Sequence, residues 1–85
     1  MAVASYDFAT LSRRVEETLH AAFPGSAVST SEGWHGRIHA KIVSPAFDGM
    51  DERSRQATVW EALTAEMGED SQAVSLVLVF GIDEI

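Results

Sequence analysis

The chain contains no cysteine, which excludes disulfide bonds, thiolate metal ligands and a thiol nucleophile. It has only two prolines, and none of its apolar runs approaches the ~20 residues that a membrane-spanning helix needs. Nor does a leader of basic and then apolar residues open the sequence. We therefore expect a soluble, cytoplasmic protein that makes no contact with a membrane.

Basic residues are also scarce, and they are unevenly placed. Six Lys and Arg residues stand against 13 Asp and Glu residues, which gives a net charge of −7. Every basic residue lies at or before Arg55, and residues 56–85 contain six acids and no Lys or Arg. Because a nucleic-acid partner requires several cations to neutralise phosphates, this pattern disfavours general nucleic-acid binding and anionic membrane surfaces.

With 85 residues, the chain is expected to form a single domain over 1–85, with a frayed end at 1–5. Such a domain has room for one core of two layers and none for a deep cleft. No pair of acid and base, and no nucleophile with its base, occurs at a recognisable spacing. Ser44 precedes Pro45 and is interpreted as a turn hydroxyl. The sequence thus predicts that the protein is not an enzyme.

Two segments have the spacing of amphipathic helices. From Asp7, apolar residues recur every three or four positions until Pro24-Gly25 ends the pattern; they are Phe8, Leu11, Val15, Leu19, Ala22 and Phe23. A second helix should begin after an N-cap at Asp51 and end at Gly68. Its inner face is expected to carry Gln56, Val59, Trp60, Leu63 and Met67.

Three segments read as strands, over 27–31, 37–44 and 73–80. In the second, Ile38, Ala40 and Ile42 alternate with polar residues, so one side should be buried and the other wet. In the third, the odd-numbered and the even-numbered positions are both apolar, which suggests that this strand has neighbours or cover on both faces. A loop over 32–36 and a turn over 45–50 complete the order.

The order α-β-β-α-β predicts an α+β fold, a single two-layer domain with a three-stranded mixed sheet and both helices on one face. The first two strands should form a hairpin, and the second and third should be parallel because a helix connects them. One face of the sheet then stays uncovered. This face would be a homodimer contact, would bind a partner protein, or would be covered by the tail over residues 82–85.

Val43-Ser44, Phe47-Asp48-Gly49-Met50, Arg55, Val59-Trp60 and Leu63 together resemble the signature of the BolA family, and the resemblance covers roughly residues 8–80. Members typically carry Val-Ser, a Phe-x-Gly turn, an Arg-His pair, then Val-Tyr and Leu. Here Gln56 replaces the His of the pair, and Trp60 replaces the Tyr. The short first loop and the Phe-Asp-Gly-Met run are similar to the IbaG-like branch.

The resemblance implies a BolA-like fold, which is related to the class II KH fold, and a role in iron–sulfur or stress-response homeostasis. It further implies a monothiol glutaredoxin as partner, with or without a shared [2Fe–2S] cluster held together with glutathione. The family supplies a histidine to this cluster from the start of the last strand. Gln72 occupies that position here, and an amide is a poorer ligand for iron than an imidazole.

His35 remains as the candidate metal ligand, and the alternative is an ordinary exposed loop histidine. Beside it, Trp34 between glycines is a candidate hot spot for a partner. His39 and Lys41, on the wet side of their strand, are further candidates for partner binding. Arg55 is either a partner-binding cation or a structural residue that pairs with Asp51 or Glu52.

Two alternatives to a cluster-sharing adaptor remain open. Gly33-Trp34-His35-Gly36 matches the Gly-x-x-Gly of KH modules, so the protein could be a nucleic-acid-binding transcriptional regulator. The match falls between expected strands, whereas the KH loop joins two helices. The second alternative is a protein-interaction domain that keeps the fold without a cluster.

Overall fold

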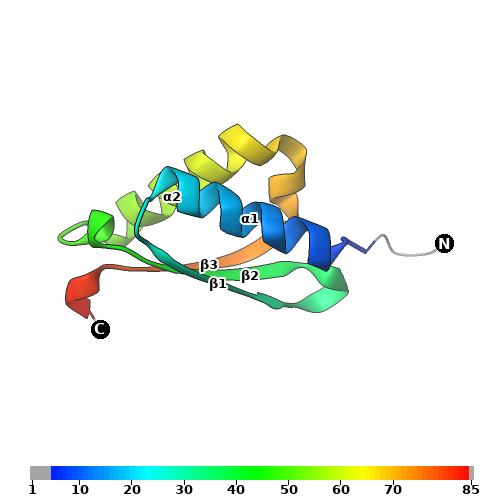
Figure 1. The fold of residues 1–85 in the computed structure, drawn as a ribbon, viewed down its shortest axis with the longest axis horizontal. Helices are drawn as coiled ribbons and strands as arrows, with labels where there is room; N and C mark the ends of the chain where they lie inside the picture. Colours follow the sequence, from blue (N-terminus) through cyan, green and yellow to red (C-terminus); the bar gives the residue numbers. More distant parts are fainter. Residues whose placement is uncertain (1–4, 85) are drawn as a thin grey trace.

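A computed structural model describes residues 5–84 of the chain. The expected order α-β-β-α-β is confirmed (Figure 1). Its helices and strands are α1 (Phe8–Ala22), β1 (Ala27–Glu32), β2 (Ile38–Val43), α2 (Glu52–Met67) and β3 (Val74–Phe80). Ser5 lies outside any helix or strand, and the rest of the segment expected to be frayed lies outside the described residues.

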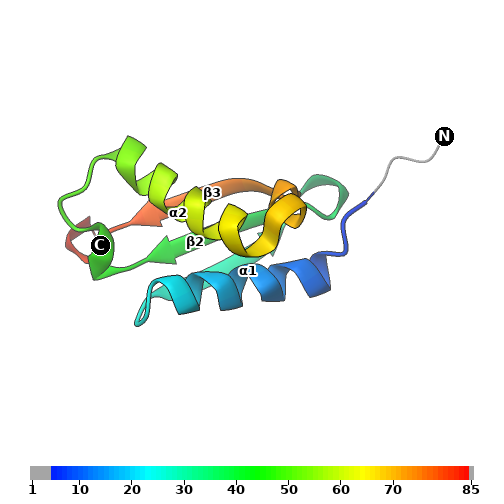
Figure 2. The same ribbon diagram turned by 90° about the horizontal axis from the view of Figure 1, so that it is seen from above.

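The three strands form one sheet in the order β1-β2-β3. As expected, β1 and β2 are antiparallel, with Thr30 opposite Ala40, and β2 and β3 are parallel, with Val43 beside Phe80. Both helices cover the same face of this sheet, while the other face is open (Figure 1). Seen from above, α1 and α2 run side by side over the strands (Figure 2).

Both helices begin at a capping aspartate, and of the two caps Asp51 was predicted from the sequence. At α1, Asp7 Oδ1 accepts a hydrogen bond from the Thr10 main-chain N–H at 3.4 Å. At α2, Asp51 Oδ1 accepts one from the Ser54 main-chain N–H at 2.7 Å. Such caps satisfy donors that the first turn of a helix leaves unpaired. Gly68 ends α2 at φ 57°, a conformation that favours glycine.

The core lies between the sheet and the helices. It contains Val15 and Leu19 of α1, Val59, Leu63 and Met67 of α2, and the inward side chains of β2 and β3, together with Phe47 and Ala73. Ile38, Ala40 and Ile42 all face the helices, so the alternation predicted for β2 is confirmed. Ala22, expected on the inner stripe of α1, is instead exposed, because it faces α2 across a groove.

β3 corrects one expectation. The apolar character of both its sides suggested neighbours or cover on both faces, but β3 is an edge strand that pairs with β2 alone. Val77 and Val79 are buried beneath the helices, whereas Leu76 and Leu78 are each 44% exposed. Packing within residues 5–84 therefore explains only half of the apolar pattern.

The segment after β3 does not lie over the open face. Residues Ile82–Glu84 form a short 3-10 turn that is tied to the β2–α2 connection, where Asp48 Oδ1 accepts a hydrogen bond from the Ile82 N–H at 2.6 Å. The prediction that the tail covers the open face of the sheet is thus wrong for residues 82–84. Ile85 lies outside the described residues. The uncovered face is left to a partner or a second copy.

The β2–α2 connection itself is a turn, as predicted. The Ser44 hydroxyl accepts a hydrogen bond from the Ala46 N–H at 3.1 Å, which is the structural use expected of it, and the Phe47 side chain is fully buried. Among the described helices, none combines the length and the apolar character needed to cross a lipid bilayer.

Candidate functional site

The connection between β1 and β2 is a short loop held by main-chain hydrogen bonds. The Gly33 N–H donates to the Arg37 carbonyl at 2.7 Å, and the Arg37 N–H donates back to the Trp34 carbonyl at 3.0 Å. A third bond comes from outside the loop, since the Tyr6 N–H donates to the His35 carbonyl at 3.0 Å. These bonds fix the loop from both sides, so little ordering would be required on binding.

Two successive residues of this loop adopt left-handed backbone conformations, His35 at φ 56° and Gly36 at φ 75°. For histidine this region costs roughly 1–2 kcal/mol. Glycine is required at the second position because a Cβ there would overlap the Tyr6 carbonyl oxygen. Backbone strain in a non-glycine residue is an observation from which a functional role can be inferred.

The loop presents a large aromatic side chain to solvent. Trp34 is 79% exposed, the most of any large hydrophobic residue in 5–84. Its ring lies edge-on to the His35 imidazole, with 5.1 Å between centroids and 81° between planes. A rigid, exposed tryptophan offers much apolar area at low conformational cost, which is typical of residues that dominate protein interfaces.

The start of β3 lies at the same end of the sheet as this loop, because Val74 pairs with Ile38. Gln72, which is exposed and lies two residues before Val74, therefore belongs to that end too. Within residues 5–84, no group of three or more His, Asp or Glu side chains is arranged to hold a metal ion. Of the two positions that the family resemblance connects with a cluster, this chain offers one imidazole, His35, and one amide.

The open face of the sheet continues from the loop. We define it by the side chains that point away from the helices, which are Ser29, Ser31, His39, Lys41, Leu76, Leu78 and Phe80. All except Phe80 line a shallow hollow of about 220 Å³, and Lys41 Nζ lies 5.5 Å from the centre of the Phe80 ring. None of these side chains is acidic, although the chain carries 13 acids.

Most of the residues predicted for partner binding are brought together. Trp34 and His35 occupy the loop, and His39 and Lys41 follow on the open face. His39 also supports the loop, since its imidazole packs on Gly33, where Nε2 would lie 2.6 Å from an added Cβ. We call these four residues, with Leu76 and Leu78, the loop-and-sheet surface.

Arg55 lies apart from this surface, near the end of the sheet where β2 finishes. It is only 6% exposed, and its Nε donates to the Phe47 carbonyl at 3.1 Å. It forms an ion pair with Glu84 rather than with Asp51 or Glu52. The guanidinium therefore has a structural role, and little of its surface is left for a partner.

Leu76 and Leu78 were not among the residues predicted for binding. The apolar run of the last strand was a signal for them, but the sequence could not distinguish apolar residues that are buried in the core from apolar residues that are exposed for binding.

The Gly33–Gly36 match to the KH loop lies between β1 and β2, as expected. The chain matches no protein-family model and no curated protein.

Proposed function

We propose that this protein is a BolA-like adaptor, which docks onto a monothiol glutaredoxin through the loop-and-sheet surface and performs no chemistry of its own. One observation carries the proposal: a tryptophan that is 79% exposed stands on a hydrogen-bonded, strained loop beside an open sheet face free of acids. Nothing within the described fold requires such an exposed ring. Its burial by another protein would account for it.

The chemistry of this surface suits a protein partner. Trp34, Leu76 and Leu78 offer apolar area, and Lys41 with His39 offers hydrogen-bond donors. In a chain of net charge −7, an acid-free face is the part of the molecule that repels an acidic partner least. The surface would thus select both the orientation and the partner.

Iron is supported more weakly than docking. A cluster shared with this chain would find the His35 imidazole, while Gln72 stands where the resemblance calls for a second histidine. The residues of this chain do not fit a cluster that needs two of its ligands here. They fit one in which glutaredoxin and glutathione supply the remaining ligands, so docking is proposed to proceed with or without [2Fe–2S].

The docking proposal is tested by isothermal titration calorimetry of the full chain with an apo monothiol glutaredoxin. We expect binding in the micromolar range, typical of transient partners, and at least tenfold weaker binding by Trp34→Ala. Ile82→Ala is the matched control, since Ile82 is another exposed apolar residue outside the surface. Absence of wild-type binding, or equal losses in both variants, would refute the proposal.

The cluster is tested separately, by anaerobic reconstitution with glutaredoxin, glutathione and iron, followed by visible circular dichroism. We expect His35→Ala to change the spectrum and Gln72→His to strengthen it. If His35→Ala leaves the spectrum unchanged, His35 is not a ligand. That result would leave the docking proposal standing, because docking is measured without iron.

Nucleic-acid binding is the second candidate, and the acid-free face with Lys41 is the feature that favours it. A single lysine neutralises few phosphates, however, and affinity falls steeply with salt when contacts are few. Fluorescence anisotropy with random duplex DNA near physiological salt should therefore show no binding. Micromolar affinity there would favour a regulator over the adaptor.

A further inference from the structure

β1 has a free edge that the proposed function does not use. The strand lies at one side of the sheet and pairs with β2 alone. Beyond its end the Gly33 N–H bonds the Arg37 carbonyl across the pair, and the main-chain groups of successive residues point to opposite edges. The odd-numbered residues of β1 therefore bond β2. The even-numbered ones, Val28, Thr30 and Glu32, direct their N–H and C=O groups away from the sheet.

These outward groups have no partner inside the described part of the molecule. Within residues 5–84, no loop, cap or side chain bonds the main chain of Val28, Thr30 or Glu32. The opposite side of the sheet differs, because Gln56 of α2 donates to the Val77 carbonyl of β3. β1 also lacks the lysine, the proline and the bulge with which sheets commonly protect an edge. Its main chain therefore offers a regular row of donors and acceptors to a fourth strand.

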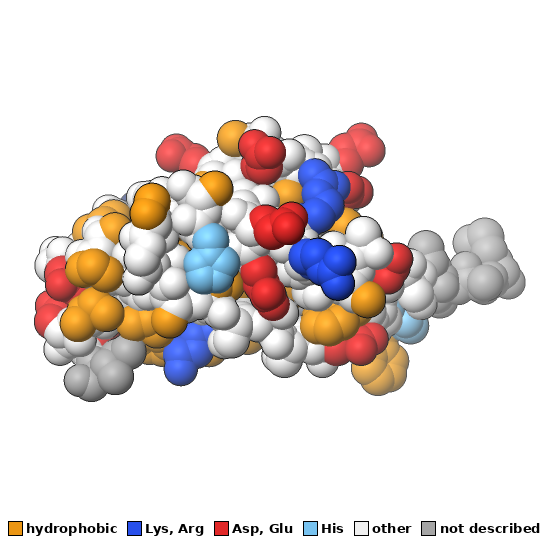
Figure 3. Space-filling model, in the orientation of Figure 1, with side chains coloured by type: hydrophobic (Ala, Val, Ile, Leu, Met, Phe, Trp, Pro, Cys, Tyr) orange, Lys and Arg blue, Asp and Glu red, His pale blue; other side chains and the backbone are white. Residues whose placement is uncertain are grey.

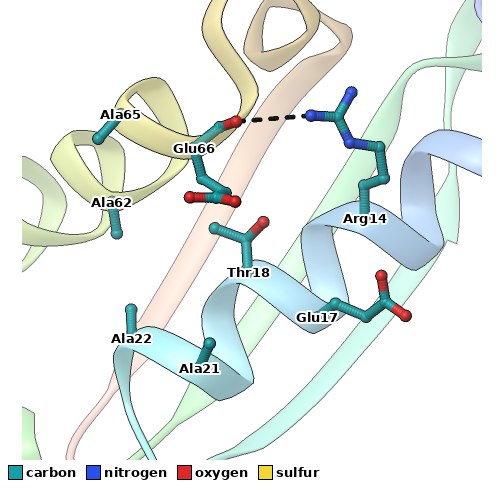
Figure 4. Close-up of a pocket in the computed structure, with 8 residues that line it drawn as sticks. All are labelled: Arg14, Glu17, Thr18, Ala21, Ala22, Ala62, Ala65 and Glu66. Carbon is teal, nitrogen blue, oxygen red and sulfur yellow. Dashed lines mark hydrogen bonds between the residues drawn. The ribbon is translucent and has the colours of Figure 1, made fainter.

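α1 holds an acid beside this edge. The hydroxyl of Thr30 donates to Glu16 Oε2 at 2.6 Å, which fixes the carboxylate next to the strand. On its other flank, α1 is anchored to α2, where Arg14 donates to the Glu66 carbonyl at 3.5 Å (Figure 4) and pairs with Asp70. The Glu16 carboxylate is thus positioned before any partner arrives, which lowers the cost of binding.

The charges along the edge indicate what kind of strand fits. Glu16 and Glu32, the last residue of β1, form no ion pair within residues 5–84. Arg13 is exposed one turn away from Glu16 on the same side of α1. Acidic and basic side chains are accordingly intermingled on the side of the molecule where α1 and β1 lie in front (Figure 3). The added strand therefore needs one base opposite Thr30 rather than a run of them.

A second copy of the chain does not fit this edge. α1 lies chiefly over β1 (Figure 2), and neighbouring strands are ~4.8 Å apart, whereas helices pack at about 8–10 Å. Pairing of two β1 edges would therefore force two α1 helices into overlap. It would also bring two Glu16 carboxylates together in a chain of net charge −7. An extended segment without a covering helix avoids both problems.

We propose that the edge of β1 takes up an extended segment of a second partner protein as a fourth, antiparallel strand. The main chain of this segment would bond Val28, Thr30 and Glu32. A Lys or Arg opposite Thr30 would project to the helix side of the sheet and reach Glu16. This goes beyond the proposed docking of glutaredoxin, because the segment occupies the edge of the sheet and leaves the loop-and-sheet surface uncovered.

The test titrates a synthetic peptide into the isotope-labelled full chain. The peptide has about eight residues, enough to span a typical strand, and consists of Thr, Val and Ser with one central Arg. Amide hydrogen exchange is followed by NMR. We expect saturable binding and about tenfold slower exchange at the N–H groups of Val28, Thr30 and Glu32. Exchange at Ser29 and Ser31 should change little, because these residues already bond β2.

Peptides with N-methyl groups show whether main-chain bonds carry the binding. Methylation of the Arg nitrogen and of alternate nitrogens on either side removes the donors that face β1 in an antiparallel pair, so it should abolish binding. Methylation of the intervening nitrogens should be tolerated. Replacement of the Arg by Glu should weaken binding about tenfold. Equal binding of the two methylated peptides, or spectral changes confined to Leu76 and Leu78, would overturn the proposal.

Variants of the protein complete the test. Glu16→Gln should weaken the Arg peptide about fivefold, because the carboxylate loses its charge. Glu17→Gln is the matched control, since Glu17 lies on the flank of α1 that faces α2, and it should bind like the wild type. An equal effect of the two variants would contradict the assigned contact. A free chain that is a dimer, dissociated by the peptide, would show that a second copy occupies the edge instead.

The two proposed surfaces are separated by their variants. Glu16→Gln should still bind glutaredoxin, and Trp34→Ala should still bind the peptide. Failure of glutaredoxin to bind would refute the proposed function and leave the strand addition at β1 standing.

Discussion

The side-chain amide of Gln56 donates a hydrogen bond to the main-chain oxygen of Val77 at 2.8 Å. The Phe80 carbonyl points toward β2, because it accepts a hydrogen bond from the Ser44 N–H at the end of that strand. Successive carbonyls along a strand point to opposite edges, so the Val77 carbonyl, three residues earlier, points toward the free edge of β3. Trp60 Nε1 in turn donates to Gln56 Oε1 at 3.2 Å. One residue of α2 thereby blocks an edge to which another strand could otherwise add.

We predict that Gln56→Ala lowers the free energy of unfolding by about 1–3 kcal/mol, because it leaves a strand carbonyl and an indole N–H without their partner. Self-association should also increase as the edge is uncovered. Urea denaturation measures the first effect, and sedimentation velocity measures the second. Gln72→Ala is the control, since Gln72 is exposed and removes no such contact. Equal stability of the two variants would contradict the assigned role.

A second prediction separates backbone strain from steric overlap at the loop. Gly36 and Gly25 have similar φ angles, at 75° and 82°, but of the two only Gly36 would bring an added Cβ against another atom, the Tyr6 carbonyl oxygen. Gly25→Ala should cost about 1 kcal/mol from the left-handed conformation alone. Gly36→Ala should cost clearly more in thermal or urea unfolding. Indistinguishable losses would show that Tyr6 moves aside freely.

The third prediction concerns two neighbouring arginines of α2. Arg55→Ala removes a buried guanidinium together with its hydrogen bond to the Phe47 carbonyl and its ion pair with Glu84, so we expect a loss of about 2–4 kcal/mol of unfolding free energy. The half-exposed Glu84 can be rehydrated, which limits the penalty. Arg53→Ala should change stability by less than about 0.5 kcal/mol, because Arg53 is exposed on the same helix. A similar effect of both substitutions would rule out the structural role of Arg55.

The fourth prediction is a pH dependence. The hydrogen bond from the Ser54 main-chain N–H is the main cause that lowers the pKa of Asp51 below its ordinary value of 3.8. A carboxylate with a lowered pKa adds stability that is complete above pH 3.8 and is lost as the pH falls through the folded-state value. The advantage of the wild type over Asp51→Asn should therefore shrink in acid.

Urea titrations of both proteins between neutral pH and the acid limit of folding would measure this difference. Glu61→Gln serves as control, because the Glu61 carboxylate makes no hydrogen bond or ion pair within residues 5–84, and its difference from wild type should stay flat. If the advantage over Asp51→Asn grows in acid, the sign of the effect is wrong.

Local rules predicted most of the fold. The alternation at Ile38, Ala40 and Ile42 placed β2 correctly, since only one side of that strand meets the helices. Asp51 and Gly68 marked the ends of α2 because caps and left-handed residues have strong chemical preferences. The parallel pairing of β2 and β3 followed from the helix between them.

Long-range relationships were beyond the sequence. Nothing in the spacing of Arg55 pointed to Glu84 rather than Asp51, because that pair depends on how the chain returns after β3. The left-handed backbone of His35 and the exposure of Leu76 likewise follow from tertiary arrangement. The hydrogen bond from Thr30 to Glu16 had no signal either, because it depends on where α1 lies over the sheet.

The acid-free open face also affects how strongly copies of the protein associate with one another in solution. Electrostatic repulsion between molecules of charge −7 keeps Leu76 and Leu78 of one copy away from the same residues of another. This repulsion weakens with added salt, because the Debye length shortens from ~30 Å in 0.01 M salt to ~8 Å at physiological ionic strength. Added salt, or a pH near the isoelectric point of 4.7, should therefore promote reversible clustering when no partner occupies that face.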